Sequence, residues 1–137
     1  MKHALRFILI DDDQFTLIFV EKTIRDYYPN AEIITFIEAN QALNYILLEY
    51  NTLKDHLYTV LITDLHMPQI DGFELIKRLE QTQNNVRNQL HIFVLSAAAD
   101  PDEIRRVLLH SIVVGFFNKP VSNDTIQEMM KNIPYPY

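Results

Sequence analysis

Short apolar runs alternate along the chain with longer stretches in which apolar residues recur at helical spacing. The apolar runs cover residues 7–10, 33–37, 60–63, 91–95 and 113–117. The stretches with helical spacing cover residues 14–27, 39–50, 73–79, 101–109 and 124–133. The run at 60–63 lacks polar alternation, which is typical of a central strand buried on both faces. Strands that alternate with helices predict a three-layer α/β/α fold, in which helices cover both faces of a five-stranded parallel sheet.

The segments between these elements carry turn and capping signals. Asp100 is a suitable N-cap for the fourth helix, with Pro101 at its first position. Residues 51–58 show no clear period and are interpreted as a connection. The amide-rich residues 81–89 are interpreted as a surface extension, and residues 134–137 as a loose tail.

Two further signals concern single residues. Asp13 is interpreted mainly as the N-cap of the first helix, and the Asp71-Gly72 pair as turn chemistry. The chain has only two glycines, Gly72 and Gly115, so we expect each to lie where the backbone permits little else.

Length and composition restrict the class of protein. A chain of 137 residues with 48% hydrophobic content has the size of a single domain, here 1–137 with a core of about 5–133. The absence of cysteine excludes disulfides and thiolate sites and favours a cytoplasmic location. No apolar run is long enough to span a membrane, so we expect no membrane contact. The net charge of -6 opposes direct nucleic-acid binding.

Polar residues follow four of the predicted strands at the point where each strand ends. Asp11 and Asp12 follow the first strand, Asp64 the third, Ser96 the fourth, and Lys119 lies near the end of the fifth. Ligands bind in the crevice at the carboxyl ends of the strands in an open parallel sheet. We therefore expect these five side chains to converge.

Three converging carboxylates repel one another, and either protons or a cation must relieve the repulsion. Mg2+ prefers oxygen ligands and therefore suits such a site. The nearby lysine indicates that the ligand bound there is an anion. A carboxylate can act as a nucleophile toward phosphorus, and a metal, a hydroxyl and an ammonium can hold the added negative charge. The pattern therefore indicates phosphoryl chemistry on an aspartate.

Four motifs in this order resemble the signatures of the response-regulator receiver domain, and the resemblance covers essentially the whole chain. The motifs are Ile8–Asp13, Thr63–Gly72, Val94–Ala97 and Gly115–Pro120. The resemblance implies a flavodoxin-like, CheY-like sheet with strand order 2-1-3-4-5.

The same resemblance implies roles for the acids. Asp64 would be phosphorylated by a histidine kinase or a histidine phosphotransfer protein. Asp12 and Asp64 would be direct Mg2+ ligands, with the backbone carbonyl of His66 as a third and Asp11 acting largely through water. We therefore expect Mg2+ to be the cofactor.

The resemblance also implies which residues contact the phosphoryl group and respond to it. Ser96 would donate a hydrogen bond to it, Lys119 would pair with it, and the peptide bond before Pro120 would be cis. Ser96 and Phe116 would switch together and couple the site to the face of the fourth helix, fifth strand and fifth helix. Many receivers carry tyrosine where this chain has Phe116, so the hydroxyl is absent but the ring remains.

These implications predict a stand-alone response regulator, because no output domain follows within the sequence. Its signal would leave through a phosphorylation-dependent face that binds a downstream protein target, and a homodimer is left open. The chemistry would be assisted self-phosphorylation and slow autodephosphorylation, so we expect no enzyme in the usual sense.

Two alternatives compete with this interpretation. A haloacid-dehalogenase-like phosphatase would use the Asp-x-Asp motif that Asp11 and Asp13 match, but Phe15 departs from that family's pattern and Asp64 would go unexplained. A receiver-fold adaptor that is not phosphorylated would need neither the complete acid set nor Ser96 and Lys119. Loss of phosphate label on Asp64→Ala, as opposed to Asp11→Ala, separates the receiver from the phosphatase.

Overall fold

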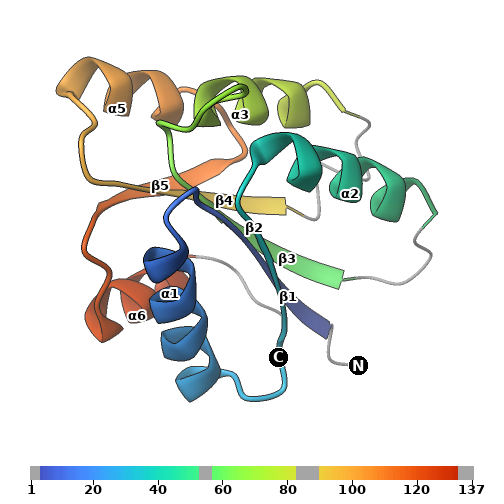
Figure 1. The fold of residues 1–137 in the computed structure, drawn as a ribbon, viewed down its shortest axis with the longest axis vertical. Helices are drawn as coiled ribbons and strands as arrows, with labels where there is room; N and C mark the ends of the chain where they lie inside the picture. Colours follow the sequence, from blue (N-terminus) through green and yellow to red (C-terminus); the bar gives the residue numbers. More distant parts are fainter. Residues whose placement is uncertain (1–3, 53–56, 83–89, 133–137) are drawn as a thin grey trace.

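The computed structural model describes residues 4–52, 57–82 and 90–132, and the predicted strands and helices are all present there (Figure 1). The strands are β1 (Ala4–Ile10), β2 (Glu32–Phe36), β3 (Leu57–Thr63), β4 (Leu90–Ser96) and β5 (Val113–Asn118). The helices are α1 (Gln14–Tyr27), α2 (Ala39–Thr52), α3 (Gly72–Glu80), α5 (Pro101–Leu108) and α6 (Asn123–Lys131). Residues 83–89 of the amide-rich segment and the predicted tail lie outside the described residues, whereas Gln81 is the C-cap of α3.

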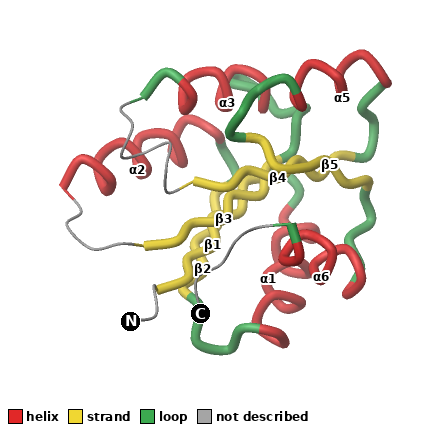
Figure 2. Tube along the Cα trace, turned by 180° about the vertical axis from the view of Figure 1, so that it is seen from behind, coloured by secondary structure: helices red, strands yellow, loops and turns green. Residues whose placement is uncertain are grey.

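The strands form one parallel sheet in the order β2-β1-β3-β4-β5. Helices α2, α3 and α5 cover one face, and α1 and α6 cover the other (Figures 1 and 2). The three-layer α/β/α architecture and the flavodoxin-like, CheY-like strand order are therefore confirmed. All carboxyl ends of the strands meet at one edge of the sheet.

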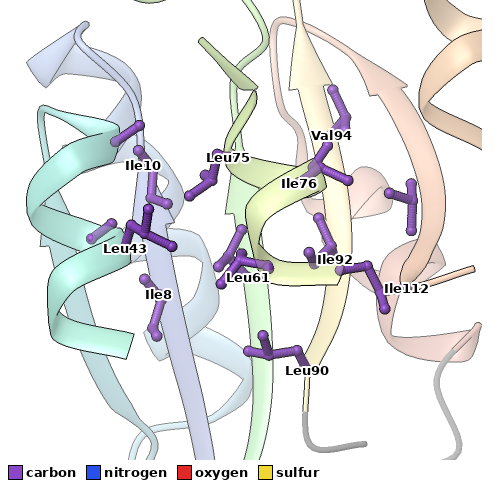
Figure 3. Packing of buried hydrophobic residues seen from close by; sticks show 14 of the residues in the cluster. Ile8, Ile10, Leu43, Leu61, Leu75, Ile76, Leu90, Ile92, Val94 and Ile112 are labelled. Carbon is purple, nitrogen blue, oxygen red and sulfur yellow. The ribbon is translucent and has the colours of Figure 1, made fainter. Parts of the chain in front are cut away.

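The core has two halves because neighbouring side chains on a strand point to opposite faces of the sheet. Ile8, Ile10 and Leu61 lie in the half beneath α2, α3 and α5, which Figure 3 shows. Phe7 and Leu9, which alternate with them on β1, lie in the half beneath α1 and α6. The central strands are packed on both faces by these two halves of the core, and this packing holds the strand ends in position.

Side-chain caps fix the starts of four helices, with Ser122 as the cap of α6. Asp13 caps α1 and accepts a hydrogen bond from the amide of Phe15, as predicted. Asp100 caps α5 in a capping box with Glu103, which confirms the signal read at that position. Asp71 caps α3, so its turn chemistry serves a helix start.

The strands β1 and β3 each begin three residues before their predicted starts, and α2 ends two residues after its predicted end. The connection predicted over 51–58 is wrong at both ends, because α2 continues to Thr52 and β3 begins at Leu57. In the same way β1 begins at Ala4, which pairs with Leu57. Ladder hydrogen bonds between backbones do not require apolar side chains, so pairing extends strands past the apolar run that predicts them.

The apolar residues of α1 fall on two faces. Ile24 is buried with Leu17 against the sheet, whereas Phe15, Ile18 and Phe19 are exposed. Helical spacing identifies the helix, but it does not say which apolar stripe faces the sheet when two are present.

The two glycines differ in what requires them. A Cβ atom on Gly72 would lie 2.4 Å from the backbone oxygen of Asp64, a clash that only glycine avoids. A Cβ atom on Gly115 would meet its nearest neighbours at 3.5 Å, an ordinary contact. The expectation that the backbone permits little else is confirmed for Gly72 and wrong for Gly115.

We expect Gly72→Ala to lower the free energy of unfolding by about 1–3 kcal/mol, the usual cost of overpacking. Gly115→Ala is the matched control, and we expect it to be neutral or to stabilise by about 0.4–1 kcal/mol through the unfolded state. Urea unfolding of both variants measures the difference. Equal effects of the two substitutions would contradict the steric explanation.

Candidate functional site

Hydrogen bonds that continue the sheet past its strands position two acids side by side. The amide of Asp11 donates to the carbonyl of Phe36 at the end of β2, at 3.1 Å. The amide of Asp64 donates to the carbonyl of Ile10 at the end of β1, also at 3.1 Å. The two aspartates therefore occupy adjacent positions one residue beyond neighbouring strands.

The two carboxylate oxygens of Asp64 have different surroundings. Oδ1 accepts hydrogen bonds from the amides of Leu65 at 2.7 Å and His66 at 3.5 Å. Oδ2 instead lies 3.1 Å from the ammonium nitrogen of Lys119. Asp64 is 8% exposed, so its carboxylate is oriented by the protein more than by water.

Lys119 joins the acids into one cluster. Its ammonium nitrogen lies 2.6 Å from Oδ2 of Asp11 as well as 3.1 Å from Oδ2 of Asp64. Burial alone would lower the pKa of Lys119, but the hydrogen bonds and charges of Asp11 and Asp64 outweigh it and leave the pKa raised. The peptide bond between Lys119 and Pro120 is cis, as predicted. The lysine is therefore held as a cation against both carboxylates.

Asp11 is the more deeply buried of the two paired acids. Burial raises its pKa, and the negative charge of Asp64 adds to the effect, whereas the hydrogen bonds from Lys119 and the Asp13 amide oppose it. Ionised Asp11 is therefore less stable here than in water. A further positive charge at the cluster would favour the ionised form.

The third acid, Asp12, is exposed at the rim of the cluster. Asp11, Asp12 and Asp64 each offer a carboxylate oxygen, and these oxygens lie within 4.8 Å of one another. An all-oxygen set with two or more carboxylates is the donor set that Mg2+ prefers. The side chains brought together therefore fit a hard divalent cation.

Ser96 ends β4 and is fully buried, and among the described residues its hydroxyl has no hydrogen-bond partner. Its carbonyl accepts a hydrogen bond from the amide of Lys119 at 3.1 Å, which ties the ends of β4 and β5 together. A buried hydroxyl without a partner costs about 1–3 kcal/mol. Ser96 is therefore a donor that a ligand at this edge could use.

Phe116 and His66 lie on the side of the sheet that α5 covers. Phe116 pairs with Val94 across β5 and β4, and its half-buried ring packs against the core there. The imidazole of His66 is exposed and lies 3.4 Å from the carboxylate of Glu103 at the start of α5. This contact was missed from the sequence, because no spacing signal links a loop residue to a helix so far along the chain.

The family profile described as "Response regulator receiver domain" matches residues 7–131. This chain belongs to the response regulator receiver domain family. The receiver fold accounts for the strand order, the acidic cluster and the lysine that precedes the cis proline.

Similar proteins include plant two-component response regulators. The receiver is 26% identical over 130 residues to the two-component response regulator ARR12 of Arabidopsis thaliana, covering 95% of this chain and 20% of that protein. It is 25% identical over 134 residues to ARR17 of the same plant, covering 94% of this chain and 84% of that protein. The chain thus spans about a fifth of the length of ARR12.

Solved structures share the fold. A two-component response regulator from Cytophaga hutchinsonii has a TM-score of 0.80 at 23% identity, over 95% of this chain and 96% of that one. A response regulator receiver protein from Dyadobacter fermentans has a TM-score of 0.78 at 25% identity, over 93% and 96%.

Receiver domains share several general properties. Receiver domains act in two-component signalling, bind Mg2+ through acidic residues and take phosphate from histidine kinases or phosphotransfer proteins. They are generally not true enzymes, and the phosphatase alternative is not favoured. Within the described part of the receiver, no helix combines the length and apolar character needed to cross a bilayer.

We expect Asp11→Asn to raise the free energy of unfolding when it is measured in EDTA at neutral pH. The raised pKa of Asp11 means that the folded wild type holds an unfavourable charge at neutral pH. That charge is removed as the pH falls through the raised pKa, so the advantage of the variant should shrink on acidification. A variant that is less stable than the wild type at neutral pH would contradict this.

Proposed function

We propose that Asp64 accepts a phosphoryl group from a histidine kinase or a histidine phosphotransfer protein. The observation that supports this most is the difference between its two oxygens: backbone amides hold Oδ1, whereas Oδ2 faces only the ammonium of Lys119 in the described hydrogen bonds. Oδ2 is therefore the oxygen that attacks. Its lone pair forms an O–P bond as the P–N bond of the donor phosphohistidine breaks, and the imidazole keeps that electron pair and takes a proton from solvent.

The residues around Asp64 then hold the transferred group. Lys119 pairs with the phosphoryl oxygens, and the unpartnered hydroxyl of Ser96 donates a hydrogen bond to them. Hydrolysis by water later releases inorganic phosphate and restores the carboxylate.

The acids hold the metal. Asp12 and Asp64 would hold Mg2+ as direct ligands, together with the backbone carbonyl of His66, and Asp11 would act largely through water. When bound, Mg2+ supplies positive charge that offsets the charge of the phosphoryl oxygens. The clustered carboxylate oxygens support this assignment.

The exposed stripe of α1 is a suitable place for the phosphoryl donor to dock. Phe15, Ile18 and Phe19 line a groove of about 700 Å³ that extends to Lys119 and Pro120. An exposed apolar patch of this kind marks a protein interaction site. A partner seated there can present its phosphohistidine to Asp64.

The signal leaves through a second surface. Movement of Ser96 toward the phosphoryl group makes room for the ring of Phe116, which is half-buried against the core under α5. The face of α5, β5 and α6 would then bind a downstream protein target. Shifting the ratio of the active to the inactive conformation of this face from 1:99 to 99:1 requires about 5.5 kcal/mol. The phosphoryl group would have to stabilise the active conformation over the inactive one by that amount.

We expect the protein to acquire one phosphoryl group from acetyl phosphate in the presence of Mg2+, detected by intact mass, and Asp64→Asn to acquire none. Asp124→Asn, an exposed acid in the first turn of α6, is the control and should label like the wild type. An unlabelled wild type would favour the adaptor alternative. Label retained on Asp64→Asn and lost on Asp11→Asn would favour the phosphatase.

We expect Mg2+ to raise the melting temperature of the wild type, because a ligand that binds only the folded state stabilises it. Asp12→Asn should lose most of this rise, since it removes a proposed direct ligand at the exposed rim of the cluster. Asp124→Asn should keep it. Differential scanning fluorimetry over a Mg2+ titration measures the three curves, and equal rises in Asp12→Asn and the wild type would exclude Asp12 as a ligand.

A further inference from the structure

Helix α5 has little apolar contact with the rest of the receiver. It lies beside α3 on one face of the sheet (Figures 1 and 2). Val107 is the one buried residue among the eight of α5, all of which the structure describes. The buried residues of α3 are Gly72, Leu75, Ile76 and Leu79. Apolar packing therefore fixes α3 more firmly than it fixes α5.

Polar contacts near both ends of α5 connect it to α3 and to the loop that leads into α3. Oε1 of Glu103, in the first turn of α5, lies 3.4 Å from Nε2 of His66 in that loop. Just beyond α5, the imidazole of His110 contacts the carboxylate of Glu80 at the end of α3. The position of α5 therefore depends on polar groups that a change of charge nearby can disturb.

The contact between Glu103 and His66 connects α5 to the acidic cluster. The amide of His66 donates a hydrogen bond to Oδ1 of Asp64 at 3.5 Å. Oε1 of Glu103, which faces the imidazole of His66, also accepts a hydrogen bond from the amide of Asp100, the N-cap of α5, at 3.1 Å. One carboxylate oxygen therefore links the start of α5 to a residue that holds Asp64.

A phosphoryl group on Asp64 would weaken this contact. It adds negative charge, which repels the carboxylate of Glu103, and its oxygens offer the imidazole of His66 another acceptor. Ser96 lies four residues before Asp100, so its proposed movement toward the phosphoryl group would displace the start of α5. The backbone of His66 is held beside Asp64 by its amide. Phosphorylation would therefore separate the carboxylate from the imidazole.

We propose that Glu103 is a positioning residue whose contact with His66 holds α5 in its unphosphorylated position and thereby opposes phosphorylation of Asp64. This role rests on the proposed function and adds a residue to it. A contact that forms in only one of two conformations stabilises that conformation. Removing the contact therefore favours the conformation that the phosphoryl group requires, and by linkage it raises the affinity of the site for such a group.

Glu74 of α3 is a matched comparison for Glu103. Each is the third residue of its helix, after an aspartate cap. The carboxylate of Glu74 pairs with Arg78 of the same helix at 3.0 Å, whereas that of Glu103 reaches His66 outside its helix. Glu74→Gln therefore removes the same charge from the same helix position without touching the proposed contact.

Titration of the full chain with beryllofluoride in saturating Mg2+, followed by NMR of the backbone amides, tests the proposal. We expect the affinity to rise about twofold to fivefold in His66→Ala and in Glu103→Gln, the range that one ion pair between partly exposed groups supplies. Glutamine at position 103 can still accept from the amide of Asp100, so the helix cap is kept. His66→Ala is the decisive variant, because it removes no negative charge from the site.

The double variant should bind no more tightly than either single variant, because both substitutions remove the same contact. Glu74→Gln should bind like the wild type. An unchanged or lower affinity in His66→Ala, additive rises in the double variant, or an equal rise in Glu74→Gln would overturn the proposal. A wild type that binds no beryllofluoride would contradict the proposed function itself, whereas equal binding by the wild type and both single variants would contradict only the role of Glu103.

Amide hydrogen exchange in EDTA measures the holding of α5 without any phosphoryl mimic. We expect the amides of residues 104–109 to exchange about twofold to fivefold faster in His66→Ala and in Glu103→Gln than in the wild type, since the lost contact lowers the cost of local opening. The amides of α3 should keep their protection. Unchanged exchange across α5 in both variants would show that the contact does not hold the helix.

Discussion

The ammonium group of Lys119 holds two buried carboxylates together at the carboxyl edge of the sheet. It lies 2.6 Å from Asp11 and 3.1 Å from Asp64, and both acids are fixed by hydrogen bonds that continue the sheet. Buried charges of one sign are tolerated only when they are paired. The lysine therefore makes the acidic cluster compatible with a folded receiver, and it leaves one oxygen of Asp64 facing a cation.

The same cluster is connected to the surfaces on which partners would act. The carbonyl of Leu65, the residue after Asp64, accepts from the first amide of α3, and a glycine is required there because the helix start touches the backbone of Asp64. His66 contacts Glu103 at the start of α5. A change of charge at Asp64 can therefore bias α3 and α5 through direct contacts, without a long chain of intermediates.

The sequence predicted the features that depend on local pattern and on motif order. Apolar runs identified the strands, and Asp13 and Asp100 identified helix starts, because caps need particular side chains at particular positions. The strand order was predicted from the resemblance to receiver domains and not from local pattern. Pairing across the sheet, which extends β3 to Leu57, depends on a partner strand that local pattern does not contain. The burial of Arg6, which pairs with two glutamates distant in the chain, was missed for the same reason.

A crystal structure with Mg2+ and beryllofluoride, a mimic of the phosphoryl group, tests the central claim most directly. We predict that the beryllium atom is bonded to Oδ2 of Asp64, with the ammonium of Lys119 and the hydroxyl of Ser96 within hydrogen-bond distance of the fluorines. Lys119 should then have moved away from Asp11. A beryllofluoride group on Asp11, or one on Asp64 that leaves the Ser96 hydroxyl without a partner, would contradict the assignment of these residues.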